Sequence, residues 1–305
     1  VLARRDPRLL VVVGPCSVHD PAAGAEYAAL LAAASRRLAD DLVVVLRAYL
    51  EKPRTVTGWP GLLTVPTPGG PSDPAVGLRT GRALLTGLAA ELPLAYEFVD
   101  PVLAPYVADT MSWGAIGART VACQPHRHMA SWLPMPVGMK NCVSGRTDTA
   151  LAAIRAAAHR HTLPTVAPDG RLIALDSTGN PDTHLVLRGG PTPNYDRACV
   201  ARARTELGAA GLPERIVVDA SHGNSGKDHN RRPAVVADLA EQIADGDRSL
   251  VGVMIESYLA DGAQDPAAVP LRRDLSVTDA CLGWERTVPL LDALALASRR
   301  RRERG

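Results

Sequence analysis

The sequence is poor in aromatic residues. One phenylalanine occurs among 305 residues, and aromatic side chains make up 4% of the chain, although 46% of the residues are hydrophobic. We therefore expect a core built from Val, Leu, Ile and Ala. The length suits one large α/β barrel or two ordinary domains.

Three further absences narrow the class of protein. No apolar run reaches membrane-spanning length and no signal peptide opens the chain, so we expect no membrane partner. The five cysteines are scattered and odd in number, which indicates reduced thiols of a cytoplasmic protein rather than a disulfide framework. A net charge of +2 lacks the concentrated excess of cations that a nucleic-acid-binding protein needs.

Lysine is nearly absent from the basic residues. Only three of the 34 basic residues are lysines, namely Lys52, Lys140 and Lys227. Lysine offers a compact, titratable ammonium that a planar guanidinium cannot replace. Lys52 and Lys140 each follow an apolar run, which favours a chemical role for both. For Lys227, chance retention on the surface explains the residue equally well.

Short apolar runs alternate with Ala- and Leu-rich helical stretches, as in a parallel sheet wrapped in helices. We expect helices over residues 20–38, 76–92, 147–159 and 288–300. The runs with strand character are residues 9–14, 43–49, 94–99, 113–118, 136–139, 184–187, 216–218 and 250–255.

These eight strands predict a (β/α)8 TIM barrel. Residues 165–176, interrupted by Asp169-Gly170, are expected to form a β-hairpin insertion between strands five and six. The whole chain, residues 1–305, is then one catalytic domain. A doubly wound parallel sheet is the alternative, although it would not require polar residues after all eight strands.

In a (β/α)8 barrel the active site lies at the C-terminal ends of the strands. Here those ends carry polar or metal-competent side chains: Cys16, Arg47 with Lys52, Glu97, Arg119, Lys140, Arg188, His222 and Glu256. The pattern predicts one polar mouth that all eight strands share.

The cationic members of this mouth predict an anionic ligand. They are Arg47, Lys52, Arg54, Arg119, Lys140 and Arg188. Single arginines at strand ends usually form structural ion pairs, but six cations around one mouth would repel one another without a polyanion. Gly117-Ala118 and Gly189-Gly190 would let backbone amides approach it. A phosphorylated carboxylic acid fits this description.

A second group of strand-end residues predicts a metal. Cys16, His222, Glu256 and Asp279 together offer thiolate, imidazole and carboxylate donors, which suit Mn, Fe, Co or Zn. Taken singly, Cys16 is more often a buried small hydrophobe, and the dispersed spacing is no motif. A metal beside a polyanion, with Lys140 and Glu97 as proton-transfer candidates, predicts carbon–carbon bond formation between phosphorylated metabolites.

Eight stretches of the chain resemble one known family. They are residues 10–17 (LVVVGPCS), 51–55 (EKPRT), 112–120 (SWGAIGART), 136–141 (PVGMKN), 187–190 (LRGG), 219–222 (DASH), 252–257 (GVMIES) and 276–281 (SVTDAC). Their order and composition resemble the type I 3-deoxy-D-arabino-heptulosonate 7-phosphate (DAHP) synthases, which open the shikimate pathway to the aromatic amino acids. The resemblance spans nearly the whole chain.

The resemblance implies a (β/α)8 enzyme that condenses phosphoenolpyruvate with erythrose 4-phosphate and releases phosphate. It implies that Cys16, His222, Glu256 and Asp279 bind the divalent metal, expected to be Mn, Fe or Co with Zn as a further option. Such enzymes form homodimers or homotetramers, and we expect the same here.

The resemblance also distributes the substrate contacts. Arg119 and Arg188, beside Gly117 and Ala118, would hold the enolpyruvate phosphate. Arg47, Lys52 and Lys140 would bind its carboxylate, whereas Arg54 and Thr55, next to Pro53, would take the aldose phosphate. The residues expected to act in catalysis are Lys140, Glu97, Cys16 and His222.

Several stretches depart from the family pattern. The loop of residues 64–74 is rich in Pro and Gly and lacks the acidic residues that members of the family usually carry there, residues 165–171 differ from the usual hairpin, and His128 replaces a common acid. We expect the N-terminal regulatory extension to be absent. A sister enzyme that uses phosphoenolpyruvate with another aldose is therefore one alternative. A non-catalytic regulatory partner is another, but the chain has lost neither a metal ligand nor a phosphate-binding cation.

Overall fold

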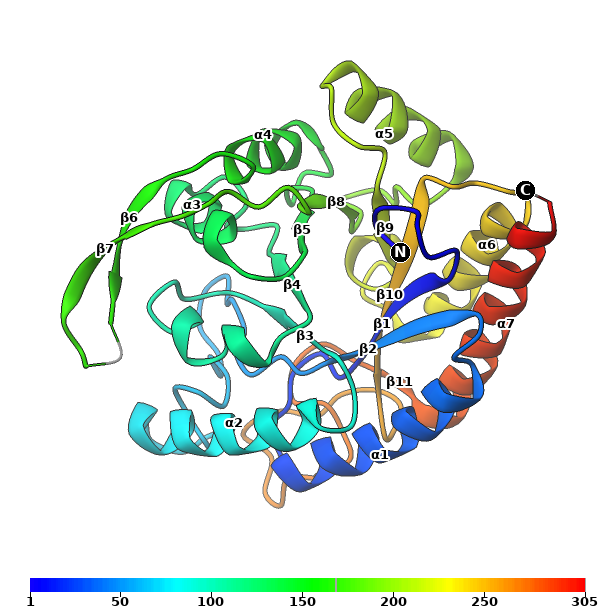
Figure 1. The fold of residues 1–305 in the computed structure, drawn as a ribbon. Helices are drawn as coiled ribbons and strands as arrows, with labels where there is room; N and C mark the ends of the chain where they lie inside the picture. Colours follow the sequence, from blue (N-terminus) through cyan, green and yellow to red (C-terminus); the bar gives the residue numbers. More distant parts are fainter. Residues whose placement is uncertain (168, 305) are drawn as a thin grey trace.

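The structure is a computed structural model that describes residues 1–167 and 169–304. Its centre is a closed barrel in which each strand pairs in parallel with the next and β1 pairs with β10 (Figure 1). The barrel strands are β1 (Leu9–Gly14), β2 (Leu42–Arg47), β3 (Leu94–Glu97), β4 (Trp113–Ile116), β5 (Val137–Lys140), β8 (His184–Leu187), β9 (Ile216–Asp219) and β10 (Leu250–Tyr258). The predicted (β/α)8 barrel is confirmed, and the doubly wound alternative is wrong.

Helices surround this barrel (Figure 1). They are α1 (Pro21–Arg37), α2 (Pro74–Ala89), α3 (Gln124–Trp132), α4 (Asp148–Ala157), α5 (Arg197–Ala209), α6 (Arg232–Ala244) and α7 (Trp284–Glu303). Short elements complete the chain: η1 (Ala104–Tyr106), η2 (Ala108–Thr110), η3 (His222–Ser225), η4 (His229–Arg231) and β11 (Leu282–Gly283).

An aspartate caps the N-terminus of each of three described helices. Asp20, Asp73 and Asp196 each accept a hydrogen bond from a backbone N–H in the first turn of α1, α2 and α5. In α1 and α2 a proline follows, which fits the first turn because its missing N–H would have no partner there. Within the described part of the chain, no helix is both long and apolar enough to cross a membrane.

Strands β6 (Thr162–Val166) and β7 (Leu172–Asp176) lie between β5 and β8 in the chain. They pair antiparallel, with Thr162 opposite Asp176 and Val166 opposite Leu172, and they form an arm that extends away from the barrel (Figure 1). Pro168, in the connection, lies outside the described residues.

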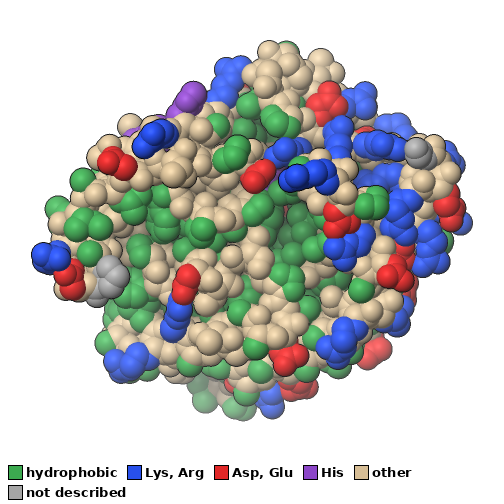
Figure 2. All heavy atoms as spheres, in the orientation of Figure 1, with side chains coloured by type: hydrophobic (Ala, Val, Ile, Leu, Met, Phe, Trp, Pro, Cys, Tyr) green, Lys and Arg blue, Asp and Glu red, His purple; other side chains and the backbone are tan. Residues whose placement is uncertain are grey.

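The alternation of side chains along the strands separates two apolar layers. Leu10 and Val12 of β1 belong to a cluster inside the barrel, whereas Leu9, Val11 and Val13 pack under the helices. The inner cluster fills the barrel, so the polar residues predicted for the site lie beyond it, at the C-terminal ends of the strands. Figure 2 shows the same view as Figure 1, with Lys and Arg side chains gathered near the C-terminal end of α7.

The tight inner packing predicts opposite effects at two glycines. A Cβ on Gly138 of β5 would lie 2.5 Å from Val186 Cγ2 and 2.6 Å from Trp113 Cζ2, whereas a Cβ on exposed Gly87 of α2 meets nothing within 4 Å. We expect Gly138→Ala to lower the free energy of unfolding by about 1–3 kcal/mol. Gly87→Ala should raise it by up to about 1 kcal/mol. Urea denaturation measures both, and equal effects would contradict the packing argument.

Candidate active site

A cavity of about 310 Å³ opens at the C-terminal mouth of the barrel. Its lining includes most of the sequence-predicted site: Lys52, Pro53, Arg54, Thr55, Glu97, Ala118, Arg119, Lys140, Arg188, His222 and Asp279. All three lysines of the chain line it, because Lys227 is here too. The sequence left the role of Lys227 open, and the structure places this residue in the cavity lining.

Lys140 and Glu97 form a buried ion pair across strand β4. They end β5 and β3, and Lys140 Nζ lies 2.7 Å from Glu97 Oε2. A Cβ on Gly117, just after β4, would lie 2.7 Å from Glu97 Oε1, so only glycine leaves room for the carboxylate. Burial opposes ionisation of Glu97, but Lys140 and Lys52 outweigh it and lower its pKa to about 2.

Lys52 connects this pair to the thiol of Cys16. Its Nζ donates to the carbonyl of Cys16 at 3.2 Å and to Cys16 Sγ at 3.1 Å. Burial and Glu256 raise the pKa of the Cys16 thiol, and the Lys52 ammonium partly offsets them. An ammonium beside Sγ therefore favours the thiolate that a metal ligand requires.

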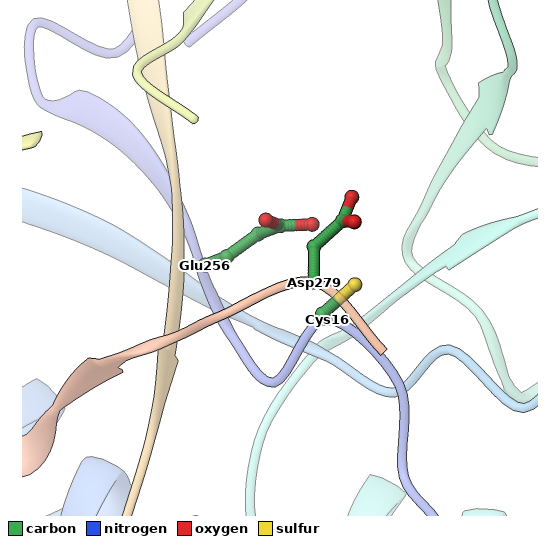
Figure 3. Close-up of side chains that lie close together, drawn as sticks. All are labelled: Cys16, Glu256 and Asp279. Atoms are coloured by element: carbon green, nitrogen blue, oxygen red, sulfur yellow. The ribbon is translucent and has the colours of Figure 1, made fainter. Parts of the chain in front are cut away.

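Cys16, Glu256 and Asp279 converge from three separate elements (Figure 3). One donor atom from each lies within 4.8 Å of the other two. His222 adjoins them, with Nε2 at 3.7 Å from Glu256 Oε1. The four sequence-predicted ligands thus lie together, and their mixed S, N and O donors fit a first-row divalent metal.

Two residues that orient these ligands were not predicted. Asp219 lies 2.7 Å from His222 Nδ1, which leaves Nε2 facing Glu256. Arg232 donates to Glu256 Oε2 at 3.1 Å and to its carbonyl at 2.6 Å. The signal for Asp219 was its place three residues before His222. Nothing in the sequence separates Arg232 from the other arginines.

Arg47 lies beneath the cavity. Its side chain is fully buried, and its guanidinium pairs with Glu256 Oε1 at 3.2 Å and lies 4.0 Å above the Tyr49 ring. The structure thus joins Arg47 to the metal-ligand set, and its predicted contact with a substrate carboxylate stays a prediction.

Two asparagines hold the backbone of Arg188 and Gly189. Asn141 Oδ1 accepts from the backbone N–H of Arg188 at 2.7 Å, and Asn194 Oδ1 accepts from that of Gly189 at 2.8 Å. Gly189 has φ +73°, and a Cβ there would lie 2.5 Å from the backbone of Gly223, so the turn requires glycine. Sequence reasoning missed these asparagines.

Arg119 contacts the loop after β2, which lines the cavity. Its Nε donates to Thr55 Oγ1 at 3.1 Å, which connects β4 to the loop after β2. Arg119, predicted to bind the enolpyruvate phosphate, and Thr55, predicted to bind the aldose phosphate, are therefore in contact.

Glu51 holds that loop from below. Its carboxylate accepts from Tyr96 Oη at 2.9 Å and from the backbone N–H of Asp100 at 3.1 Å. Burial raises the pKa of Glu51 to about 7, and the hydrogen bond from Tyr96 only partly offsets this. Lys52 follows Glu51 in the sequence, and Glu97 follows Tyr96. The hydrogen bond between Glu51 and Tyr96 therefore helps to fix the distance between Lys52 and Glu97.

Comparisons with known proteins identify relatives along the whole chain. The family model described as the DAHP synthetase I family matches residues 1–292. The chain is 48% identical over 294 residues to an Escherichia coli protein named phospho-2-dehydro-3-deoxyheptonate aldolase, Tyr-sensitive, covering 95% of this chain and 83% of that protein. A Schizosaccharomyces pombe protein of the same name, tyrosine-inhibited, is 46% identical over 310 residues, covering 99% and 83%. The solved structure of the Francisella tularensis aldolase superposes with a TM-score of 0.96 at 40% identity, covering 98% and 88%.

The Asp219–His222 contact generates a prediction for metal affinity. Asp219→Asn removes the carboxylate that fixes the imidazole, and loss of such a partner typically costs about 10–100-fold in metal affinity. Isothermal titration with Mn²⁺ would measure the change. Exposed Asp182→Asn is the control, because it leaves the metal ligands untouched. Equal affinities for Asp219→Asn and the unaltered protein would contradict the role of Asp219.

The buried carboxyl of Glu51 generates a prediction for pH. Its pKa is raised from 4.5 to about 7, so the folded state binds this proton more tightly than the unfolded state. Its contribution to stability is therefore present below about pH 4.5 and is lost as the pH rises through about 7. Urea denaturation from pH 5 to 8 should show a smaller loss of stability in Glu51→Gln. Parallel profiles would contradict this.

Proposed function

Because the chain belongs to the DAHP synthetase I family, we propose that it condenses phosphoenolpyruvate with erythrose 4-phosphate and water to give DAHP and phosphate. This is the first step of the shikimate pathway. The observation that carries the proposal is the meeting, at one mouth, of the Cys16–Glu256–Asp279 donor set and a cavity lined by three lysines and three arginines.

Phosphoenolpyruvate would occupy the inner part of the cavity. Arg119 and Arg188 would hold its phosphate with forked guanidinium contacts, and Lys52 and Lys140 would neutralise its carboxylate. The backbone of Gly117-Ala118 adjoins the same anion. Arg47 would act from beneath through the electrostatic field, since Glu256 already binds its guanidinium.

Erythrose 4-phosphate would enter on the outer side, where Pro53, Arg54 and Thr55 line the cavity. Arg54 and Thr55 would bind its phosphate. The contact between Thr55 and Arg119 would then hold the two phosphates at a fixed separation. The aldehyde would lie next to the nucleophilic carbon of the enolpyruvate.

The Lys140–Glu97 pair is suited to moving protons. As the enol carbon bonds to the aldehyde carbon, the aldehyde oxygen gains a proton, which the Lys140 ammonium can supply. A water then adds to the carbon that bears the phosphate. Glu97, an ionised carboxylate, can accept the proton from that water, and the hydroxyl proton of the adduct leaves with the phosphate as the carbon–oxygen bond to phosphate breaks.

Cys16, His222, Glu256 and Asp279 would hold a divalent metal, with Mn, Fe or Co proposed and Zn compatible with the same donors. When bound, such an ion would supply Lewis-acid polarisation of the aldehyde. We also propose that the chain is one catalytic domain that works in the cytoplasm as a homodimer or homotetramer. Five free thiols support that compartment.

The proposed reaction predicts coupled consumption of both substrates. With Mn²⁺, we expect one phosphate released per phosphoenolpyruvate consumed when erythrose 4-phosphate is present. We expect almost none without the aldose or after EDTA treatment. Lys140→Met should lower kcat by about 100-fold or more, because it removes a proton donor. A malachite-green assay with product identification by mass spectrometry measures this.

Arg286→Met is the control for that series, since the half-buried Arg286 side chain lies outside the cavity lining. No phosphate release with erythrose 4-phosphate, but release with another aldose phosphate, would contradict the proposed second substrate. Turnover that survives complete metal removal would contradict the role of the four metal ligands.

A further inference from the structure

A second and larger cavity lies outside the barrel, between α4 and α5. Its volume is about 810 Å³, and none of its lining residues belongs to the active-site cavity. In Figure 1, α5 stands away from α4 at the top of the molecule, and the side chains that line the cavity come from both helices and from the loops before them. Known small-molecule sites span about 300–1,000 Å³, so the cavity is large enough for one.

The lining combines an apolar wall with a charged rim. Leu151, Ala152 and Pro193 provide the accessible apolar part, and Leu187 and Ala203 lie almost fully buried behind it. Arg146, Arg155 and Arg202 supply cations, whereas Asp148 and Glu206 supply carboxylates. The cavity is an open groove with exposed charges on its rim, in which one ligand could contact apolar side chains and charges together.

The two carboxylates are already engaged. Asp148 pairs with Arg146, and Glu206 accepts a hydrogen bond from Thr147. Arg155, on α4, instead donates to the carbonyl of Ala210 at 2.9 Å. Arg202, on α5, donates to Cys199 Sγ at 3.0 Å.

Within the residues that the structure describes, neither Arg155 nor Arg202 has a carboxylate partner. Each guanidinium has five N–H donors, so most of them stay available. The two cations approach the cavity from opposite helices, which complements an anionic group held between them.

We infer that this cavity binds a small organic anion with an apolar body, whose carboxylate, sulfonate or phosphate contacts Arg155 and Arg202. The apolar body packs against Leu151 and Pro193. The charge selects an anion, and the volume selects a molecule larger than an inorganic ion.

The cavity shares a wall with the loop that presents Arg188. Asn194 lines the cavity, accepts from the N–H of Gly189 and donates through Nδ2 to Asn141 Oδ1 at 3.3 Å. Asn141 Oδ1 in turn accepts from the N–H of Arg188. A ligand that moves Asn194 therefore moves the backbone of Arg188, and this step rests on the proposed function. We expect occupancy to change the KM for phosphoenolpyruvate more than kcat.

The test uses 8-anilinonaphthalene-1-sulfonate, an aromatic sulfonate whose fluorescence rises in apolar sites. Arg155→Ala/Arg202→Ala should weaken its Kd by about tenfold or more, because two charged donors are lost. Ala152→Trp, at an exposed lining position on α4, should weaken it by filling the cavity. Arg197→Ala is the matched control, since this arginine also lies on α5 but pairs with Asp245 outside the cavity.

An unchanged Kd in both the double variant and Ala152→Trp would overturn the inference. Equal weakening in Arg197→Ala would also overturn it, by showing non-specific charge attraction. A change of oligomeric state in Ala152→Trp without a change in Kd would show that the groove is an interface between copies, and this too would overturn the inference.

The kinetic arm is measured separately, as the KM for phosphoenolpyruvate at saturating sulfonate in the unaltered protein and in Ala152→Trp. A shift of this KM in the unaltered protein but not in Ala152→Trp supports the coupling. No shift in either protein overturns it. If the unaltered protein makes no DAHP, the proposed function fails, while the fluorescence titration still decides whether the site exists.

Discussion

The site depends on one buried carboxylate held between two buried guanidiniums. Glu256 is fully buried, with Arg47 at 3.2 Å from Oε1 and Arg232 at 3.1 Å from Oε2. A buried carboxylate without partners would take up a proton. Burial does disfavour the charge, but His222, Arg47 and Arg232 outweigh it and hold the pKa of Glu256 far below its usual range. An ionised Glu256 carboxylate at the mouth thus requires β2, β10 and α6 in their native places.

Because the buried acids must be neutralised, the cations of the mouth fall into two groups. One group pairs with a buried acid, and the other does not. Arg47 and Arg232 neutralise Glu256 from below and from the side, so they are already engaged. Lys52 and Lys140 neutralise Cys16 and Glu97. Arg119 and Arg188 have no carboxylate partner among the described ion pairs, which leaves their charge for a ligand. The cavity therefore has a net positive potential, although each buried acid in it is paired.

The sequence predicted most of the fold because each signal was local. Apolar runs of strand length and aspartate-proline helix starts depend only on neighbouring residues, so the barrel strands and helices α1 and α2 could be placed from them. The strand ends predicted the site, because barrel geometry brings those ends together whatever their spacing. Asp279, the fourth predicted metal ligand, lies in the loop after the last barrel strand, and its place there, together with its carboxylate, pointed to it before the family resemblance did.

The residues that were missed act through contacts distant in sequence. Arg232 sits in the first turn of α6, where any polar residue is ordinary, and its importance comes from a partner 24 positions away. Asn141 and Asn194 act on each other across 53 positions. Arg47 ends β2, two residues before the predicted end of the strand, and β10 brings Glu256 within hydrogen-bonding distance of it. Such pairings follow from the packed tertiary structure, which no local pattern contains.

The few lysines of the chain pointed to the site because lysine is rare here, and the contacts of Lys52 also show why an arginine would not fit there. Lys52 Nζ contacts both the carbonyl and the thiol of Cys16, a narrow point that a compact ammonium can enter. Arg232 instead spans Glu256 Oε2, the Glu256 carbonyl and the Ala280 carbonyl, which needs a fork of donors. An arginine at position 52 would have to place its planar group against Sγ, where a metal ligand needs open space. The chain therefore keeps lysine where one point charge must lie beside a donor atom, and arginine where several acceptors must be held at once.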